Sequence, residues 1–221
     1  MQTLLLLDLD GTLVDTPHYE AWRNAAHRFG AGEFTYAEYL KHVAGRPRED
    51  GAARLLRLKF GCTAYDPRIA AESRALAALK QNEFVRIAGL SQLFDDALRL
   101  LERIEAARQN VAFYTASQNA PRLFAVALHR LGRKSVPHHI ARQRDAETRE
   151  ALFLRLIGNF APDCVRLVDD APHAVDRACG LGIRACQIRR HASGPTARDQ
   201  RAAILQTLDA LLVPISAPSR I

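Results

Sequence analysis

The segment Leu4-Leu5-Leu6-Leu7-Asp8-Leu9-Asp10-Gly11-Thr12 determines the fold that we expect for this chain. A short apolar run that ends at a turn signal is typical of a buried strand, which we place at residues 3–8. Gly11-Thr12 then turns the chain. Because side chains alternate along an extended strand, the two-residue spacing puts the carboxylates of Asp8 and Asp10 on one side.

Further apolar runs of strand length follow, and stretches with helical periodicity separate them. Strands that alternate with helices predict an α/β fold with a doubly wound, parallel, Rossmann-like sheet. The expected strands are residues 111–114, 139–141, 165–168 and 183–188, and the helices between them are residues 91–107, 121–131 and 148–158.

The long segment between the first two strands interrupts this alternation. Residues 17–84 have helical spacing of apolar residues, with breaks expected at 30–32, 45–47 and 61–67. The block is too long for a crossover helix. We therefore predict a helical cap domain at residues 16–87, inserted into a catalytic core made of residues 1–15 and 88–215.

Composition is that of a soluble globular protein, with 48% hydrophobic and 25% charged residues among 221. The net charge is +7. The arginines are scattered over the helices instead of forming a basic run, so we expect no nucleic-acid partner. Part of the positive charge is available to attract an anionic, phosphorylated substrate.

Location and partners are inferred from what the sequence omits. The first apolar run stops at Asp8, short of the about 7–15 residues of a signal peptide. No segment approaches the roughly 20 apolar residues of a membrane span. The four cysteines lack CxxC spacing, so we expect reduced thiols and not a zinc site. We predict a cytoplasmic protein without a membrane partner, either a monomer or a homodimer.

Three strands end in polar residues, and in open α/β sheets such ends form the ligand site. One carboxylate of the Asp8–Asp10 pair can attack phosphorus while the other handles a proton. Acids beside a phosphate need a cation, and hard oxygen ligands favour Mg²⁺. Asp169 and Asp170 supply further ligands, and the Thr115 hydroxyl can donate to a phosphoryl oxygen.

Each cluster alone also has a purely structural interpretation. An isolated Asp-x-Asp-Gly-Thr can be an ordinary strand and turn, and Asp169-Asp170 can be a helix N-cap. The three clusters together, each after a buried strand, favour the chemical interpretation.

These motifs resemble the haloacid dehalogenase superfamily of phosphatases and phosphomutases, with a helical cap after the first motif. The match covers roughly residues 3–188: residues 8–15 resemble the first motif, 113–117 the second and 167–170 the fourth. The resemblance implies that Asp8 is the nucleophile and Asp10 the general acid/base. It also implies a Mg²⁺ site made by Asp8, Asp10, Asp169 and Asp170, and phosphate binding by Thr115.

Two stretches resemble the β-phosphoglucomutase and phosphoglycolate phosphatase-like branch. They are residues 115–121 and, in the predicted cap, Gly45-Arg46-Pro47-Arg48-Glu49-Asp50. By this likeness Ala116, Ser117 and Asn119 line the phosphate and substrate site, and Arg48 reaches the substrate phosphate. Similar loops occur in plain phosphatases, so the likeness leaves phosphatase and mutase both open.

The third motif departs from the family pattern. Where the family has a lysine, this sequence has Asp145, and Lys134 is too far upstream. Arg142, Arg144 and Arg149 are near, and an arginine can bind the same phosphoryl oxygens. Spacing favours Arg144, with Arg142 close behind.

We therefore expect a Mg²⁺-dependent phosphatase that hydrolyses a small phosphorylated metabolite through an aspartyl-phosphate on Asp8. The first alternative is a sugar phosphomutase, which returns the phosphoryl group to another hydroxyl of the sugar. A non-catalytic phosphate-binding module is a third possibility, supported only by the missing lysine.

Overall fold

A computed structural model describes residues 2–63, 66–117, 119–133, 140–144, 147–191 and 195–212. The chain divides into two compact units. The core unit contains the described residues of Met1–Asp15, Gln92–Ala192 and Thr196–Ile221, and the helical unit contains those of Thr16–Ser91 together with Pro195.

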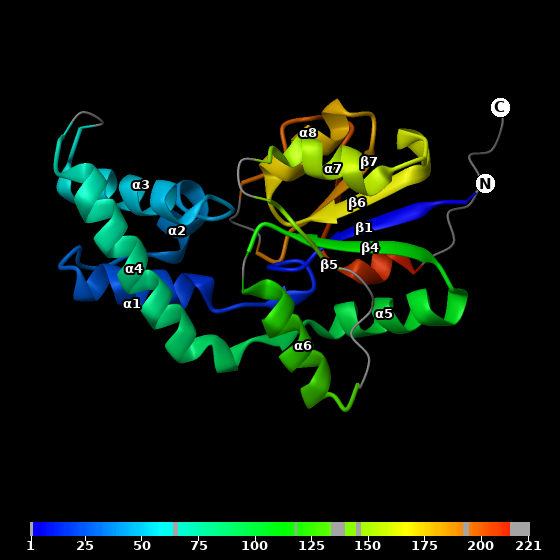
Figure 1. Cartoon of the computed structure of the whole chain (residues 1–221), viewed down its shortest axis with the longest axis horizontal. Helices are drawn as coiled ribbons and strands as arrows, with labels where there is room; N and C mark the ends of the chain where they lie inside the picture. Colours follow the sequence, from blue (N-terminus) through cyan, green and yellow to red (C-terminus); the bar gives the residue numbers. More distant parts are fainter. Residues whose placement is uncertain are drawn as a thin grey trace. The chain divides into compact units, whose positions relative to one another are not determined.

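The core unit is built on a parallel sheet, which confirms the predicted fold class. Six of the described strands form one sheet in the order β5-β4-β1-β6-β7-β8, and every neighbouring pair in it is parallel (Figure 1). The strands are β1 (Leu4–Asp8), β4 (Asn110–Thr115), β5 (Ile140–Arg142), β6 (Val165–Asp169), β7 (Arg184–Ile188) and β8 (Ala203–Leu205).

Helices cover both faces of this sheet. Leu5 and Leu7 of β1 pack with α5 (Asp95–Ala107) and α6 (Ala120–Arg130). Leu4 and Leu6 point to the other face and pack with α7 (Arg149–Ile157) and α8 (Pro172–Gly180). The two pairs of helices lie on opposite sides of the sheet in Figure 1. All four leucines are buried, as expected for a central strand of a doubly covered parallel sheet.

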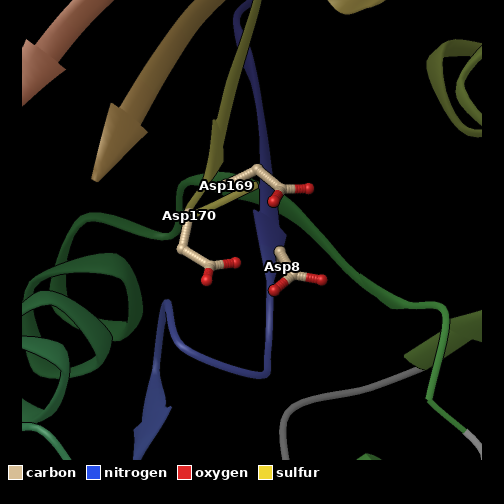
Figure 2. A group of neighbouring side chains, drawn as sticks. All are labelled: Asp8, Asp169 and Asp170. Carbon is tan, nitrogen blue, oxygen red and sulfur yellow. The ribbon is translucent and has the colours of Figure 1, made fainter. Parts of the chain in front are cut away.

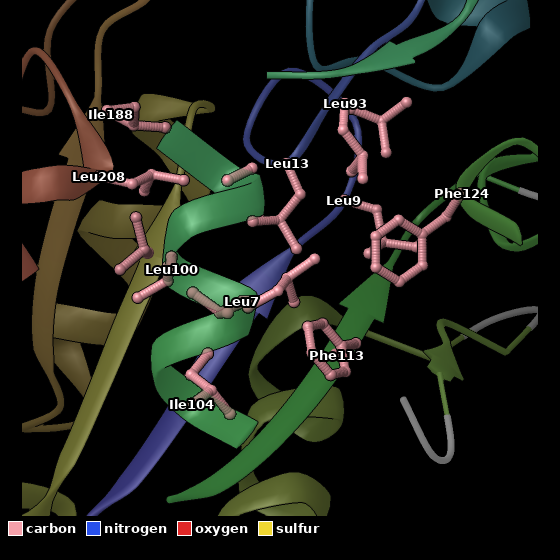
Figure 3. Close-up of a cluster of buried hydrophobic side chains, with 14 of the residues drawn as sticks. Leu7, Leu9, Leu13, Leu93, Leu100, Ile104, Phe113, Phe124, Ile188 and Leu208 are labelled. Atoms are coloured by element: carbon pink, nitrogen blue, oxygen red, sulfur yellow. The ribbon is translucent and has the colours of Figure 1, made fainter. Parts of the chain in front are cut away.

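The apolar cluster on the α5 and α6 side extends past the end of β1. Figure 3 shows Leu9 and Leu13, which flank the turn after β1, among the side chains of this cluster. Both are fully buried. Burial of a leucine contributes about 1.5–3 kcal/mol. The turn is therefore fixed by packing on both sides of Asp10, Gly11 and Thr12.

Some elements differ from the prediction. The predicted helix at 91–107 starts later, at Asp95, because Gln92–Leu93 forms strand β3, which pairs antiparallel with β2 (Val14–Asp15). β8 was not predicted, because it has only three residues and two of them are exposed. Of the expected strand at 139–141, His139 lies outside the described residues. Short 3-10 helices are η1 (Ala88–Leu90), η2 (Pro162–Cys164) and η3 (Leu208–Leu211).

The helical unit confirms the helical character predicted for residues 17–84. It contains α1 (His18–Arg28), α2 (Tyr36–His42), α3 (Arg48–Phe60) and α4 (Ile69–Ile87), separated near the predicted breaks. Its core includes Trp22, Phe34, Leu55, Leu56 and Leu76. Among the described helices, none is both long and apolar enough to span a membrane.

Candidate active site

The carboxyl ends of β4, β1 and β6 lie side by side at one edge of the sheet. In the strand register Asp8 is opposite Tyr114, and Leu7 is opposite Val168. The next residues along β4 and β6 are Thr115 and Asp169, so the register brings the predicted polar clusters to the same level. Ligands of open α/β sheets bind at this edge.

The turn after β1 is held by backbone hydrogen bonds. The carbonyl of Leu9 accepts N–H groups from Thr12, Leu13 and Val14, at 3.3, 2.9 and 2.9 Å. Gly11 has φ +76°, in the left-handed region. A Cβ at Gly11 would lie 2.5 Å from Oδ2 of Asp170, so both the backbone and the neighbouring carboxylate require glycine.

Three carboxylates converge at this edge: those of Asp8, Asp169 and Asp170 (Figure 2). One oxygen from each lies within 4.8 Å of the other two. Asp8 and Asp169 are buried, while Asp170 is half-buried. Figure 2 shows Asp8 at the end of β1 and the other two at the end of β6.

Asp169 is held by hydrogen bonds to both of its oxygens. The hydroxyl of Tyr114 donates to Oδ2 at 2.6 Å, and the backbone N–H of Ala171 donates to Oδ1 at 2.8 Å. The Tyr114 ring is fully buried and packs edge-on against Phe153 of α7, with centroids 5.4 Å apart. The buried Tyr114 ring, through its hydroxyl, therefore fixes the orientation of the Asp169 carboxylate.

The carboxylates strongly perturb one another. Burial, followed by the charges of Asp169, Asp170 and Asp10, raises the pKa of Asp8 well above its usual range. Burial and the charges of Asp169 and Asp10 raise the pKa of Asp170 in the same way. Arg149 opposes both shifts. Like charges in a dry site resist simultaneous ionisation, so the cluster carries more negative charge than its surroundings compensate.

These residues fit a divalent cation. Mg²⁺ binds oxygen ligands at about 2.0–2.1 Å, which places opposite ligands roughly 4 Å apart. One oxygen of each carboxylate lies within 4.8 Å of the other two, so the three oxygens are near enough to share one ion. A cation would also relieve the repulsion that raises the two pKa values. Asp8, Asp169 and Asp170 are thus the residues that could hold the ion, and the Asp10 side chain is not among the three.

Asp10 instead lies beside the second polar cluster. Oδ2 of Asp10 accepts a hydrogen bond from Oγ1 of Thr115 at 3.3 Å. Thr115 Oγ1 in turn accepts the N–H of Ser117 at 2.9 Å, and Ser117 Oγ accepts the N–H of Asn119 at 3.3 Å. This chain of contacts brings four of the predicted residues together, with Ala116 in the same loop between Thr115 and Ser117.

The three predicted arginines that spacing and resemblance pointed to, Arg48, Arg142 and Arg144, are all exposed. Arg48 is exposed at the first position of α3, in the helical unit. Arg144 is exposed, and its backbone N–H donates to Glu147 at 2.9 Å. Arg142 is exposed at the end of β5. Asp145 and Lys134 lie outside the described residues. The charge of Arg149 lowers the pKa values of Asp8 and Asp170 and so opposes their upward shifts.

The sequence motifs did not single out Tyr114, and they left Arg149 as one of three arginines near the third motif. In the sequence, Tyr114 has the pattern of an ordinary strand residue. Arg149 is one of several arginines near the start of a predicted helix. The available signals were weak. Tyr114 directly precedes Thr115, and Arg149 begins the helix that leads to β6.

The helical unit contains a buried cation that the sequence did not indicate. Lys80 of α4 is 4% exposed, and its Nζ lies 2.9 Å from Nδ1 of His18. His18 stacks on Phe84 with centroids 4.4 Å apart, and Lys80 lies over the same ring at 4.4 Å. The start of α1 is therefore tied to α4 within this unit.

The core unit thus combines a parallel sheet with an acidic cluster at the carboxyl ends of its strands. This combination is found in α/β proteins that bind ligands at that edge. The family model for haloacid dehalogenase-like hydrolases matches residues 3–184. The chain belongs to the haloacid dehalogenase-like hydrolase family.

Several individual proteins are similar to this chain over most of its length. The chain is 29% identical to a β-phosphoglucomutase of Mycobacterium bovis over 234 aligned positions, which cover 88% of each chain. Among solved structures, it is similar to an archaeal β-phosphoglucomutase from Pyrococcus sp. strain ST 04, with a TM-score of 0.66, 24% identity and 95% and 96% of the two chains covered. A predicted phosphoglycolate phosphatase from Haemophilus somnus 129PT gives a TM-score of 0.74 at 15% identity, with 96% of each chain covered.

Proposed function

We propose that this protein is a Mg²⁺-dependent phosphatase that hydrolyses a small phosphorylated metabolite through an aspartyl-phosphate on Asp8. The observation that carries the proposal is the convergence of Asp8, Asp169 and Asp170 beside the Asp10–Thr115 contact. Family membership supports phosphoryl transfer as the type of chemistry.

In the first step, an oxygen of Asp8 attacks the substrate phosphorus, and the bond from phosphorus to the leaving oxygen breaks. Asp10 gives its proton to that oxygen. Thr115 is positioned by its contacts to Asp10 and Ser117, and its hydroxyl is turned to a phosphoryl oxygen once substrate is bound. Mg²⁺, when bound by the three carboxylates, supplies positive charge for the phosphoryl oxygens.

In the second step, Asp10 accepts a proton from water, and the water oxygen attacks the phosphorus of the acyl-phosphate. The bond from phosphorus to Asp8 breaks, which releases inorganic phosphate and regenerates both carboxyl groups. Asp10 therefore acts as a general acid in the first step and as a general base in the second.

We also propose that the helical unit acts as a cap over the site and contributes Arg48 to the substrate phosphate. Arg48 has no ion pair among the described residues and stands at the first position of α3, so its guanidinium is available to an anion. The proposed location is the cytoplasm, supported by four cysteines that are all free thiols.

The second candidate is a sugar phosphomutase. It is favoured by the β-phosphoglucomutase relative, whose alignment covers 88% of each chain. In that reaction the phosphoryl group on Asp8 passes to another hydroxyl of the sugar and not to water. The two candidates share every residue named above and differ in what excludes water from the second step.

The test is phosphate release from a panel of phosphorylated metabolites, measured with Mg²⁺ and with EDTA. Release that requires Mg²⁺ supports the phosphatase. An isomeric sugar phosphate formed with little free phosphate would instead establish the mutase. Binding of phosphorylated compounds without any turnover in Mg²⁺ would contradict both and leave the non-catalytic module.

A further inference from the structure

Arg149 occupies a fixed position next to the acidic cluster. It is the first residue of α7, and Leu152, Phe153 and Ile157 anchor this helix in the apolar cluster that contains Tyr114. The Cζ atom of Arg149 lies 5.9 Å from the centroid of the Tyr114 ring. The hydroxyl of that same ring holds Asp169, so α7 delivers a guanidinium to the side of the site.

The guanidinium of Arg149 is incompletely satisfied. Its Nη1 is buried and makes no hydrogen bond to any described residue. A buried donor without an acceptor destabilises the folded state, and the cost is larger for a charged group. Such a donor is expected where a bound anion supplies the missing acceptor.

The other arginines of this segment lack these features. Arg142 and Arg144 are exposed, and no buried, unpaired nitrogen is found on either within the described residues. Arg155 is engaged by Glu147, which accepts from it at 2.9 and 3.0 Å. Arg149 is thus distinguished from its neighbours by burial, by an unused donor and by its contact with Tyr114.

We propose that Arg149 binds the phosphoryl group during its transfer to Asp8, and so replaces the lysine that this sequence lacks. This assignment rests on the proposed phosphoryl-transfer function. Guanidinium donors in a fixed fork match phosphoryl oxygens, which a lysine would contact as a point charge. The assignment supersedes Arg144, which spacing alone favoured.

A purely structural role for Arg149 makes a different prediction. If Arg149 only balances the negative charge of the cluster and packs on Tyr114, its loss would lower stability without a specific loss of phosphate affinity. The experiment therefore needs a readout of anion binding that is independent of turnover.

The experiment is calorimetric titration of inorganic phosphate, in the presence of Mg²⁺, into the wild type and single variants. Arg149→Met is expected to weaken phosphate binding by at least about tenfold, since a charge-assisted hydrogen bond is lost. Arg149→Lys should recover part of the affinity. Arg122→Met, which removes an exposed arginine of α6, is the matched control and should bind as the wild type does. Melting temperatures show whether each variant is folded.

Three results would overturn the assignment. They are no phosphate binding by the wild type, wild-type affinity in folded Arg149→Met, or a loss of affinity in Arg144→Met that Arg149→Met does not share. If Arg149→Met loses affinity but the wild type hydrolyses no ester, the anion site stands and the proposed hydrolysis fails. The two proposals are therefore tested separately.

Discussion

Gly11 lies directly against the carboxylate of Asp170, because a Cβ at Gly11 would come within 2.5 Å of Asp170 Oδ2. The contact joins the turn after β1 to the end of β6. It explains why the turn needs a residue without a side chain, beyond its φ of +76°. The position of Asp170 relative to Asp8 therefore depends on the absence of one carbon atom.

We predict that Gly11→Ala displaces Asp170 and weakens Mg²⁺ binding by about 10–100-fold, the range seen when supporting contacts of metal ligands are lost. The measurement is the Mg²⁺ concentration that gives half-maximal activity. Gly132→Ala is the matched control, because Gly132 has φ +73° and no heavy atom near its would-be Cβ. Both variants should lose about 1–2 kcal/mol to backbone strain. Equal Mg²⁺ dependence in the two would contradict the prediction.

Tyr114→Phe should loosen Asp169 while leaving the apolar packing intact. The variant removes the hydroxyl that donates to Asp169 Oδ2 at 2.6 Å, and the ring keeps its contact with Phe153. We expect Mg²⁺ affinity to fall about tenfold or more. Tyr19→Phe is the control, since it removes a hydroxyl that donates to the Phe34 carbonyl in the helical unit. Unchanged Mg²⁺ dependence in Tyr114→Phe would show that Ala171 alone orients Asp169.

The metal-free protein should become less stable than Asp8→Asn as the pH rises. The pKa of Asp8 is raised in the folded state by burial and by neighbouring carboxylates. Below the unfolded-state pKa of about 3.9, Asp8 is protonated in both the folded and the unfolded state, so its ionisation does not change the free energy of unfolding. As the pH rises towards the folded pKa, the unfolded chain ionises first and the folded state loses stability.

Thermal unfolding in EDTA at pH 4 and pH 7 measures this difference. We expect the melting temperatures of wild type and Asp8→Asn to be similar at pH 4, and Asp8→Asn to be the more stable at pH 7. Adding Mg²⁺ at pH 7 should raise the wild-type value, since the ion offsets the repulsion. A stability difference that is the same at both pH values would refute this electrostatic explanation.

Arg190 links the turn after β1 to the C-terminal part of the core unit. It donates to Asp96 at 2.6 Å and to the carbonyl of Thr12, and its guanidinium lies 3.9 Å from the centroid of the Phe94 ring. Asp96 also accepts the N–H of Leu208 at 2.8 Å. Burial alone would raise the pKa of Asp96, but these donors lower it overall.

Arg190→Met should therefore destabilise the protein by about 3–5 kcal/mol, because it leaves the Asp96 carboxylate buried without its cation. Urea unfolding measures the loss. Arg99→Met removes the exposed Arg99–Asp209 pair and should cost no more than about 1 kcal/mol. A similar small loss in both variants would show that the Arg190–Asp96 pair is not important for stability.

The sequence predicted the parallel sheet because each of the expected strands is a short apolar run with its own turn signal. It also predicted a metal site of Asp8, Asp10, Asp169 and Asp170, since parallel strands bring their carboxyl ends to one edge. The carboxylates of Asp8, Asp169 and Asp170 do lie together in the structure, while that of Asp10 is not part of the group. The local sequence pattern was sufficient to predict the position of a residue that lies at the end of a strand.

Contacts that depend on tertiary packing were not predicted. Arg149 is distinguished from Arg144 only by how α7 docks on the sheet beside Tyr114. Likewise, Tyr114 becomes a support for Asp169 only through the pairing of β4 and β6 with β1. Spacing along the chain contains neither relationship, so it could not separate Arg149 from Arg144 on these grounds.

The central claim is the aspartyl-phosphate on Asp8, and direct trapping of this intermediate tests it. The protein would be mixed with its best phosphorylated substrate in Mg²⁺, quenched in acid during turnover, and digested for mass spectrometry. We predict phosphate on the peptide that contains Asp8, and none there with EDTA or in Asp8→Asn. Undiminished turnover by Asp8→Ala, or phosphate trapped on another residue while Asp8 stays unmodified, would contradict the account.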